Sequence, residues 1–206
     1  MNYLAHAFLA RATPALLTGG ILGDFVKGPL DDRYPPEIRA GIAMHRAIDG
    51  FTDTHDLVHA SRALITPERR RFAGVLVDVF YDHFLAHHWE RYAAIPLERF
   101  TADVYATLWP QRHGFPERLQ RMLPWMRADD WLAGYADLDG VDASLRGMSR
   151  RFRYPERAQP LAHGIDDLTA HYAELEKLFL EFFPEVERFA ATQGEIHIGK
   201  ADKRLP

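Results

Sequence analysis

The chain has 206 residues, of which 47% are hydrophobic and 26% are charged, the balance of an ordinary globular protein. With 25 basic and 29 acidic residues its formal net charge is -4, which excludes a general electrostatic attraction for nucleic acid or an anionic membrane. Cysteine is absent, so disulfides, thiolate metal sites and cysteine nucleophiles are excluded as well. Any metal site must use His, Asp or Glu.

No change of composition divides the chain, so we expect one domain over residues 1–194 and a polar tail over 195–206. The first ten residues lack the basic lead-in of a signal peptide. No stretch approaches the roughly 20 apolar residues that a membrane span needs. These features predict a cytoplasmic protein without a membrane partner.

Apolar residues recur at spacings of three and four along the chain, and sustained alternation is rare, which predicts an all-α, single-domain helical bundle. Three glycines precede Asp24 in the second segment and predict a bend or a close backbone contact there. Pro184 is expected to break or kink the last helix. In chain order, we expect helices at 2–11, from 13 toward 24, from 35 through 49, and at 57–64, 66–92, 96–109, 116–127, 141–152 and 166–183.

The central helix carries a carboxylate in an apolar setting. Residues 74–81 are apolar on every side except for Asp78, which predicts burial on all faces. A buried carboxylate needs a shifted pKa, a cationic partner or a metal ion. Asp82 follows one turn later on the same face, with His83 beside it, so the three side chains are expected to approach a common point.

The third helix has a stripe that changes from apolar to ionisable at His45 and Asp49, which are four residues apart. His6 in the apolar first helix and Asp24 among the glycines are also expected to point inward. Imidazoles and carboxylates without thiolate suit Mn²⁺, Mg²⁺, Fe or Zn²⁺. The sequence therefore predicts a catalytic metal ion.

Each of these residues also has a structural explanation. His6 alone fits a satisfied core histidine, Asp24 a helix cap, and Asp49 a partner of Arg46 or Arg39. The number of such groups within the first 83 residues favours a shared cation. Capping and solvation explain a further set better, namely Asp53, His55, Asp56, His87 and His88.

Four separated segments resemble the bacterial acyl carrier protein phosphodiesterases in order and spacing: 2–6, 23–28, 41–49 and 78–85, with 168–185 similar as well. The resemblance implies a hydrolase that cleaves the phosphodiester between 4′-phosphopantetheine and a serine of holo acyl carrier protein. It implies a divalent cation, typically Mn²⁺, with Mg²⁺ or Fe²⁺ as alternatives. Since that family is regarded as an unusual branch of the HD phosphohydrolases, it also implies an HD-like helical bundle.

Within this resemblance, we expect Asp24, His45, Asp49 and Asp78 to bind the metal. His6 and Asp82 are expected to be further ligands or to orient the ligands. Three residues are the candidate catalytic groups: Asp24, His83 as proton donor or phosphate contact, and Lys27, which would neutralise the phosphate.

Carrier proteins of this kind are acidic, so a local basic docking surface is expected. Residues 150–153 are better explained as a solvated helix end. For Arg69, Arg70 and Arg71 docking and solvation are equally consistent with the sequence.

Two other functions stay open from the residues alone. One is an HD-type enzyme that acts on a nucleotide or another small phosphoester. The other is a non-catalytic helical interaction module, in which the buried aspartates would pair with arginines.

Overall fold

The structure is a computed structural model that describes the backbone of residues 1–202 and the side chains of residues 1–194. The described residues form ten α-helices and no strand, which confirms the predicted all-α fold. Within residues 1–202, no helix combines the length and the apolar character that a membrane span requires.

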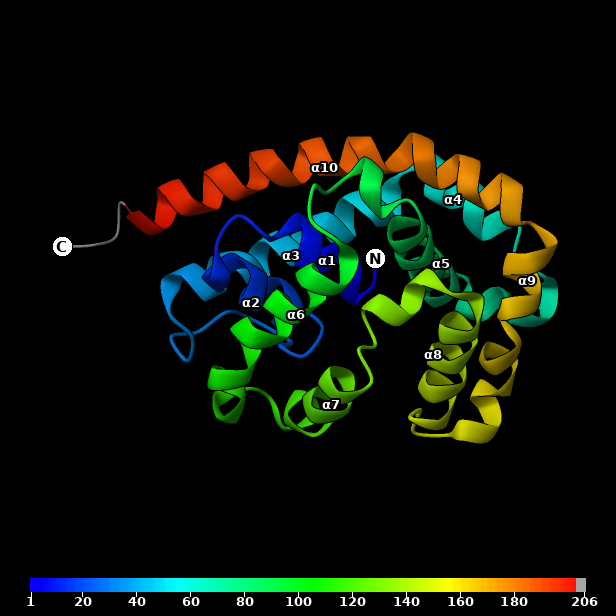
Figure 1. Cartoon of the computed structure of the whole chain (residues 1–206), viewed down its shortest axis with the longest axis horizontal. Helices are drawn as coiled ribbons and strands as arrows, with labels where there is room; N and C mark the ends of the chain where they lie inside the picture. The colour runs from blue at the N-terminus through cyan, green and yellow to red at the C-terminus, as the bar shows by residue number, and fades with distance from the viewer. Residues whose placement is uncertain (203–206) are drawn as a thin grey trace.

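Figure 1 shows the order of the helices along the chain. Short 3₁₀ turns connect several of them. The helices are α1 Tyr3–Leu9, α2 Pro14–Leu22, α3 Pro36–Thr54, α4 Asp56–Ala63, α5 Ala73–His87, α6 Leu97–Leu108, α7 Glu117–Ala128, α8 Leu138–Arg150, α9 Ile165–Ala170 and α10 Tyr172–Asp202.

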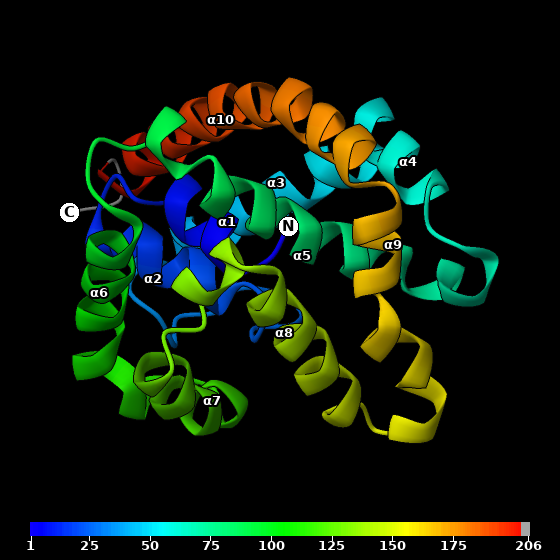
Figure 2. The ribbon, with the colours of Figure 1, turned by 45° about the vertical axis from the view of Figure 1, so that its right-hand side comes forward.

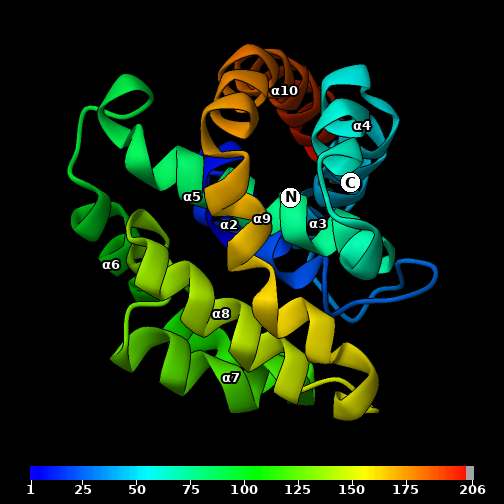
Figure 3. The same ribbon diagram turned by 90° about the vertical axis from the view of Figure 1, so that its right-hand side faces the viewer.

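Helix α1 lies at the centre of the bundle, and all seven of its residues are buried. It packs against α2 on one side and α5 on the other. Helix α10 covers one side of the molecule, where it packs along α3 and α4. Helices α7 and α8 lie on the opposite side from α10 (Figures 2 and 3). The central helix is therefore enclosed by elements from both halves of the chain.

An aromatic core holds α1, α5 and α10 together. Phe8 of α1 lies 5.9 Å from Phe183 of α10, measured between ring centroids. Tyr81 and Phe84 of α5 lie 5.4 Å and 5.8 Å from Phe179 of α10. All five side chains are fully buried, and each burial stabilises the fold by about 1.5–3 kcal/mol. This packing fixes the position of α1.

Helices α2 and α3 approach each other closely through glycine. A Cβ atom on Gly19 would lie 2.3 Å from the carbonyl oxygen of Ile38, and one on Gly41 would lie 2.4 Å from that of Leu16. Only glycine fits at such distances. The predicted close backbone contact in this segment is confirmed.

Two predicted helices differ from the structure. The long central helix is divided, because Pro67–Phe72 forms a 3₁₀ turn before α5. The last predicted helix is divided at His171, and α10 then continues through Pro184 to Asp202. A proline removes one backbone hydrogen bond, and the packing of α10 along α3 and α4 compensates for it. The predicted tail over 195–206 is thus helical to residue 202, and residues 203–206 lie outside the described part of the chain.

Candidate active site: a His–Asp cluster beside a cationic cavity

Three predicted ligands meet between α1 and α3. The Nε2 atom of His6 lies 3.0 Å from Oδ1 of Asp49, and Nε2 of His45 lies 3.1 Å from Oδ2 of the same carboxylate. The two imidazole rings stack with their centroids 3.7 Å apart. One potential ligand atom from each residue lies within 4.8 Å of the other two. The arrangement therefore brings two imidazoles and a carboxylate to one point.

The orientation of His45 is fixed by its backbone surroundings. Its Nδ1–H donates to the carbonyl oxygen of Gly20 at 2.7 Å, so Nε2 is the atom that faces Asp49. The same Nε2 lies 3.8 Å from Oδ1 of Asp24. Metal-binding histidines commonly donate their other ring N–H in this way.

Burial controls the charges of the cluster. It lowers the pKa of His6 to about 3, with the neighbouring His45 acting in the same direction, so the His6 ring is neutral. The Nδ1 atom of His6 is buried without a hydrogen-bond partner among the described residues. Burial alone would raise the pKa of Asp49, but its hydrogen bonds with His45 and His6 outweigh this and hold that pKa below its usual range.

Two further carboxylates stand beside the cluster. Asp24 follows α2, and burial raises its pKa while the nearby His45 lowers it. Asp78 of α5 approaches from the other side. The N-terminal ammonium nitrogen of Met1 lies 3.0 Å from Oδ1 of Asp78 and 3.6 Å from Oδ1 of Asp49. Both carboxylates therefore pair with the same positively charged group, the ammonium of Met1.

The face of α5 that carries Asp78 is open. Residues 74–81 were expected to be buried on all faces, and this is wrong. Val75 is 36% exposed, and both Val75 and Asp78 line a cavity that the opposite helices leave open. Asp78 is therefore accessible to a ligand that enters this cavity.

The cavity has a volume of about 290 Å³ and combines both signs of charge. Asp24 and Asp78 line it together with three cationic side chains, those of Lys27, Arg118 and Arg151. Such an arrangement can hold a cation through its carboxylates and an anionic group through its cationic side chains.

Two of these cations were missed by sequence reasoning. Arg118 lies on α7, where its guanidinium stands 5.5 Å from the ring centroid of Phe25. Arg151 follows α8, and its guanidinium lies 5.2 Å from the ring centroid of Trp131. Residues 150–153 had been interpreted as a solvated helix end. The arginines are more than ninety residues from Asp24 along the chain, so no local pattern relates them to the cluster.

Asp82 has a different position from the one predicted for a metal ligand. It is fully buried, and its two carboxylate oxygens accept hydrogen bonds from the backbone N–H groups of Leu4 at 2.8 Å and Ala5 at 3.0 Å. Asp82 thus caps the N-terminus of α1 from the neighbouring helix. The structure places it beneath the helix that carries His6, where it positions that helix.

His83 is also separated from the cluster. Its Nδ1–H donates to the carbonyl oxygen of Tyr135 at 2.8 Å, and its Nε2 lies 2.9 Å from the hydroxyl of Tyr172. Burial lowers its pKa. The expectation that Asp78, Asp82 and His83 approach a common point is therefore wrong, and His83 lies away from the cavity.

The predicted docking arginines divide into two groups. Arg69 makes a two-pronged contact with the buried Asp167, at 2.6 Å and 3.0 Å, so its charge is used within the fold. Arg70 and Arg71 are exposed, and docking by these two stays a prediction. The pairing of Arg69 resembles the buried Asp–Arg pairs that the interaction-module alternative would require. In the site itself, Asp49 and Asp24 pair with histidines, and Asp78 pairs with the ammonium of Met1.

The residues assigned to caps and solvent have mixed outcomes. His55 caps α4 by accepting the backbone N–H of Leu57 at 3.3 Å, which confirms its predicted role. His87, His88 and Glu176 form a second group of potential ligands within 4.8 Å of one another. Its atoms are more exposed than those of the first cluster, and His88 bonds directly to Glu176 at 2.8 Å.

The fold and site together define an all-helical protein with a His–Asp cluster beside a cavity that three cationic side chains line. A family model described as "Acyl carrier protein phosphodiesterase" matches residues 1–186. Proteins with this name from Yersinia pestis, Photorhabdus laumondii and Escherichia coli are 38%, 36% and 36% identical. The matches cover 92%, 89% and 94% of this chain and 97%, 92% and 100% of the respective relatives.

The chain therefore belongs to the acyl carrier protein phosphodiesterase family. This confirms the resemblance drawn from the four sequence segments. No solved structure matches the chain. The likeness to HD phosphohydrolases stays a prediction.

Proposed function

We propose that this protein hydrolyses the phosphodiester between 4′-phosphopantetheine and a serine of holo acyl carrier protein. The observation that carries the proposal is a cavity that holds three cationic side chains together with Asp24, whose Oδ1 lies 3.8 Å from Nε2 of His45 in the His–Asp cluster. Membership of the family supplies the substrate. The cavity supplies groups for both a metal ion and a phosphate.

The donor set suits a divalent cation. The convergence of two imidazoles and the carboxylate of Asp49, with Asp24 3.8 Å from His45, supports a metal site at this position. The ligands would be His6, His45, Asp49, Asp24 and Asp78, and the ion Mn²⁺, with Mg²⁺ or Fe²⁺ as alternatives. When bound, such an ion lowers the pKa of water and polarises phosphoryl oxygens.

The chain's own residues position the reacting groups. Lys27, Arg118 and Arg151 bind the phosphoryl oxygens and neutralise the charge that develops on them. The oxygen of a water molecule attacks phosphorus, and Asp24 accepts the proton that this water loses. The bond between phosphorus and the serine oxygen breaks, and the proton that Asp24 accepted passes to that oxygen. The products are the apo carrier protein and free 4′-phosphopantetheine.

A local basic surface surrounds the mouth of the cavity. Lys27, Arg118 and Arg151 are exposed there, and Arg150 is exposed at the adjoining cavity. Since the whole chain has a net charge of -4, these side chains are suited to attract an acidic carrier protein locally. A cytoplasmic location, where carrier proteins take part in lipid synthesis, belongs to the same proposal.

The test is the incubation of the purified protein with holo acyl carrier protein and Mn²⁺, Mg²⁺ or Fe²⁺, followed by intact mass measurement. We expect the carrier protein to lose the mass of phosphopantetheine, and a chelator to prevent this. Asp49→Asn should abolish the loss, whereas Asp53→Asn, an exposed position one turn further along α3, should preserve it. An unchanged carrier mass with a folded protein under all three ions would overturn the proposal.

A further inference from the structure

A second and larger cavity adjoins the site. It has a volume of about 520 Å³ and lies between α8 and the segment that connects α7 to α8. Tyr3, Met148 and Arg151 line both this cavity and the one that contains Asp24 and Asp78. A molecule whose phosphate is held by Arg151 can therefore extend directly into the second cavity.

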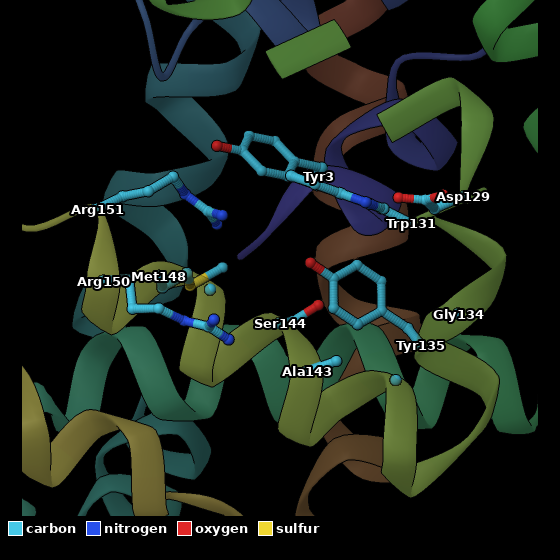
Figure 4. Close-up of a pocket in the computed structure, with 12 residues that line it drawn as sticks. Tyr3, Asp129, Trp131, Gly134, Tyr135, Ala143, Ser144, Met148, Arg150 and Arg151 are labelled. Carbon is cyan, nitrogen blue, oxygen red and sulfur yellow. The ribbon is translucent and has the colours of Figure 1, made fainter. Parts of the chain in front are cut away.

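The walls of the second cavity differ from those of the first. Tyr3, Trp131, Tyr135 and Met148 provide aromatic and thioether surface, and Ser144 provides a hydroxyl group. Figure 4 shows Arg151 entering from one side, with Trp131 on the opposite side and Ser144 near Tyr135. A mainly apolar cavity with a few polar groups fits an uncharged, elongated organic group.

Glycine keeps this space open at the end where Arg151 enters. A Cβ atom on Gly147 would lie 2.9 Å from a guanidinium nitrogen of Arg151. Without a side chain at residue 147, the guanidinium can cross α8 toward Trp131, over whose ring it lies. Arg151 thus stands at the boundary between the charged and the apolar cavity.

We infer that the second cavity binds the pantetheine arm of the substrate. This inference rests on the proposed function. The arm is uncharged and carries two amides and a geminal dimethyl group. It is attached to the phosphate through one ester oxygen, and the serine is attached through the other. A phosphate held by Lys27, Arg118 and Arg151 would direct the arm past Tyr3 and Met148 into the apolar cavity, with the carrier protein outside. Its volume is within the range of pockets that hold small organic ligands.

The test uses one bulky substitution and a matched control. Ala143 lies on α8, is exposed and lines the second cavity, so Ala143→Trp should fill the cavity without disturbing the core. Ala106 is an exposed alanine inside α6, away from both cavities, so Ala106→Trp is the control. Calorimetric titration with Mn²⁺ should give the same affinity for both variants, which shows that the His–Asp cluster is intact.

The first readout is the binding of pantetheine itself, without phosphate, carrier protein or metal. Saturation-transfer NMR should show contact of its methyl protons with the unsubstituted protein and with Ala106→Trp, and loss of that contact in Ala143→Trp. The second readout is kcat/KM for holo acyl carrier protein, which should fall by about 10-fold or more in Ala143→Trp only.

The outcomes separate the arm site from the proposed function. Release of phosphopantetheine at an equal rate by Ala143→Trp, with pantetheine binding unchanged, would overturn the arm site and leave the proposed function standing. The opposite result is also possible. If Ala143→Trp abolishes pantetheine binding but holo carrier protein is not turned over under any ion, the arm site is supported and the proposed function is overturned.

Discussion

The ring of His45 lies directly against Gly23, so closely that a Cβ atom on residue 23 would stand 2.1 Å from Cγ of the ring. The carbonyl oxygen of Gly20 holds the same ring by its Nδ1–H. The backbone at the end of α2 therefore determines where Nε2 of His45 points.

Gly23→Ala should consequently displace His45. We expect metal affinity to fall by about 10- to 100-fold, the effect of losing a group that orients a ligand, and turnover to fall with it. Calorimetric titration with Mn²⁺ measures the affinity. Gly50→Ala on α3 is the control, since a Cβ atom there would point into open space, and helix propensity predicts about 1 kcal/mol of added stability. Equal Mn²⁺ affinities of the two variants would contradict this role of Gly23.

Asp82→Asn should destabilise the protein without removing a ligand. The amide oxygen can accept one N–H of α1, but the amide NH₂ would then face the second N–H donor. We expect the free energy of unfolding to fall by about 1–3 kcal/mol. Urea unfolding measures this, and Mn²⁺ affinity measured under native conditions should change less than in Gly23→Ala. A variant as stable as the unsubstituted protein would argue against the cap.

The same carboxyl predicts a pH dependence of stability. Burial raises the pKa of Asp82 from 3.8 to about 7, against the opposing effect of the N–H groups of Leu4 and Ala5. The folded protein thus binds this proton more tightly than the unfolded chain does. The resulting stabilisation is complete below about pH 4 and is lost as the pH rises through about 7.

Urea unfolding of the metal-free protein and of Asp82→Asn between pH 4 and 8 checks this. The difference in unfolding free energy between them should decrease as the pH rises. A constant difference, or one that grows with pH, would show that the N–H groups of α1 outweigh burial.

Arg118→Ala should weaken the binding of the phosphate and of the acidic carrier protein. We expect kcat/KM for holo acyl carrier protein to fall by about 10-fold and to depend less steeply on salt, because one cation of the cavity is lost. Arg121→Ala on the same helix is the control, since Arg121 pairs with Glu117 on the exposed surface. If both variants lose the same activity, the effect belongs to α7 as a whole and the assignment to Arg118 fails.

Arg69→Ala should affect stability and leave docking unchanged. Removing this guanidinium leaves the fully buried Asp167 without its cationic partner, which costs about 3–5 kcal/mol. Arg71→Ala, at an exposed position, should cost far less. Urea unfolding gives the stabilities. If Arg69→Ala raises the KM for the carrier protein without a loss of stability, Arg69 contributes to docking and this prediction is wrong.

Much of the cluster could be predicted from the sequence because helical spacing is local. His45 and Asp49 share a face of α3 since they are four residues apart, and the structure keeps them together. His6 is the one polar residue in an apolar segment, and its predicted inward orientation is confirmed, because its side chain is buried.

The rest depends on contacts between distant segments. Asp78, Asp82 and His83 share one helix, yet Asp78 faces the cavity, Asp82 binds α1, and His83 bonds to Tyr135. Their directions are set by which helix packs against each side of α5, and this is not encoded in their spacing. The cations of α7 and α8 escaped prediction for the same reason, since they reach the cavity only through the tertiary fold.

Tyr3 and His6 are three residues apart on the buried helix α1, and they serve different ends of the site. His6 belongs to the His–Asp cluster, whereas Tyr3 lines the cavity assigned to the pantetheine arm. Three residues of α-helix, a rise of about 4.5 Å, therefore set the offset between the reacting phosphorus and the start of the arm. In the proposed enzyme α1 fixes the distance between the arm cavity and the His–Asp cluster. A prosthetic group with a longer linker would fit the arm cavity, but its phosphorus would then lie away from the cluster.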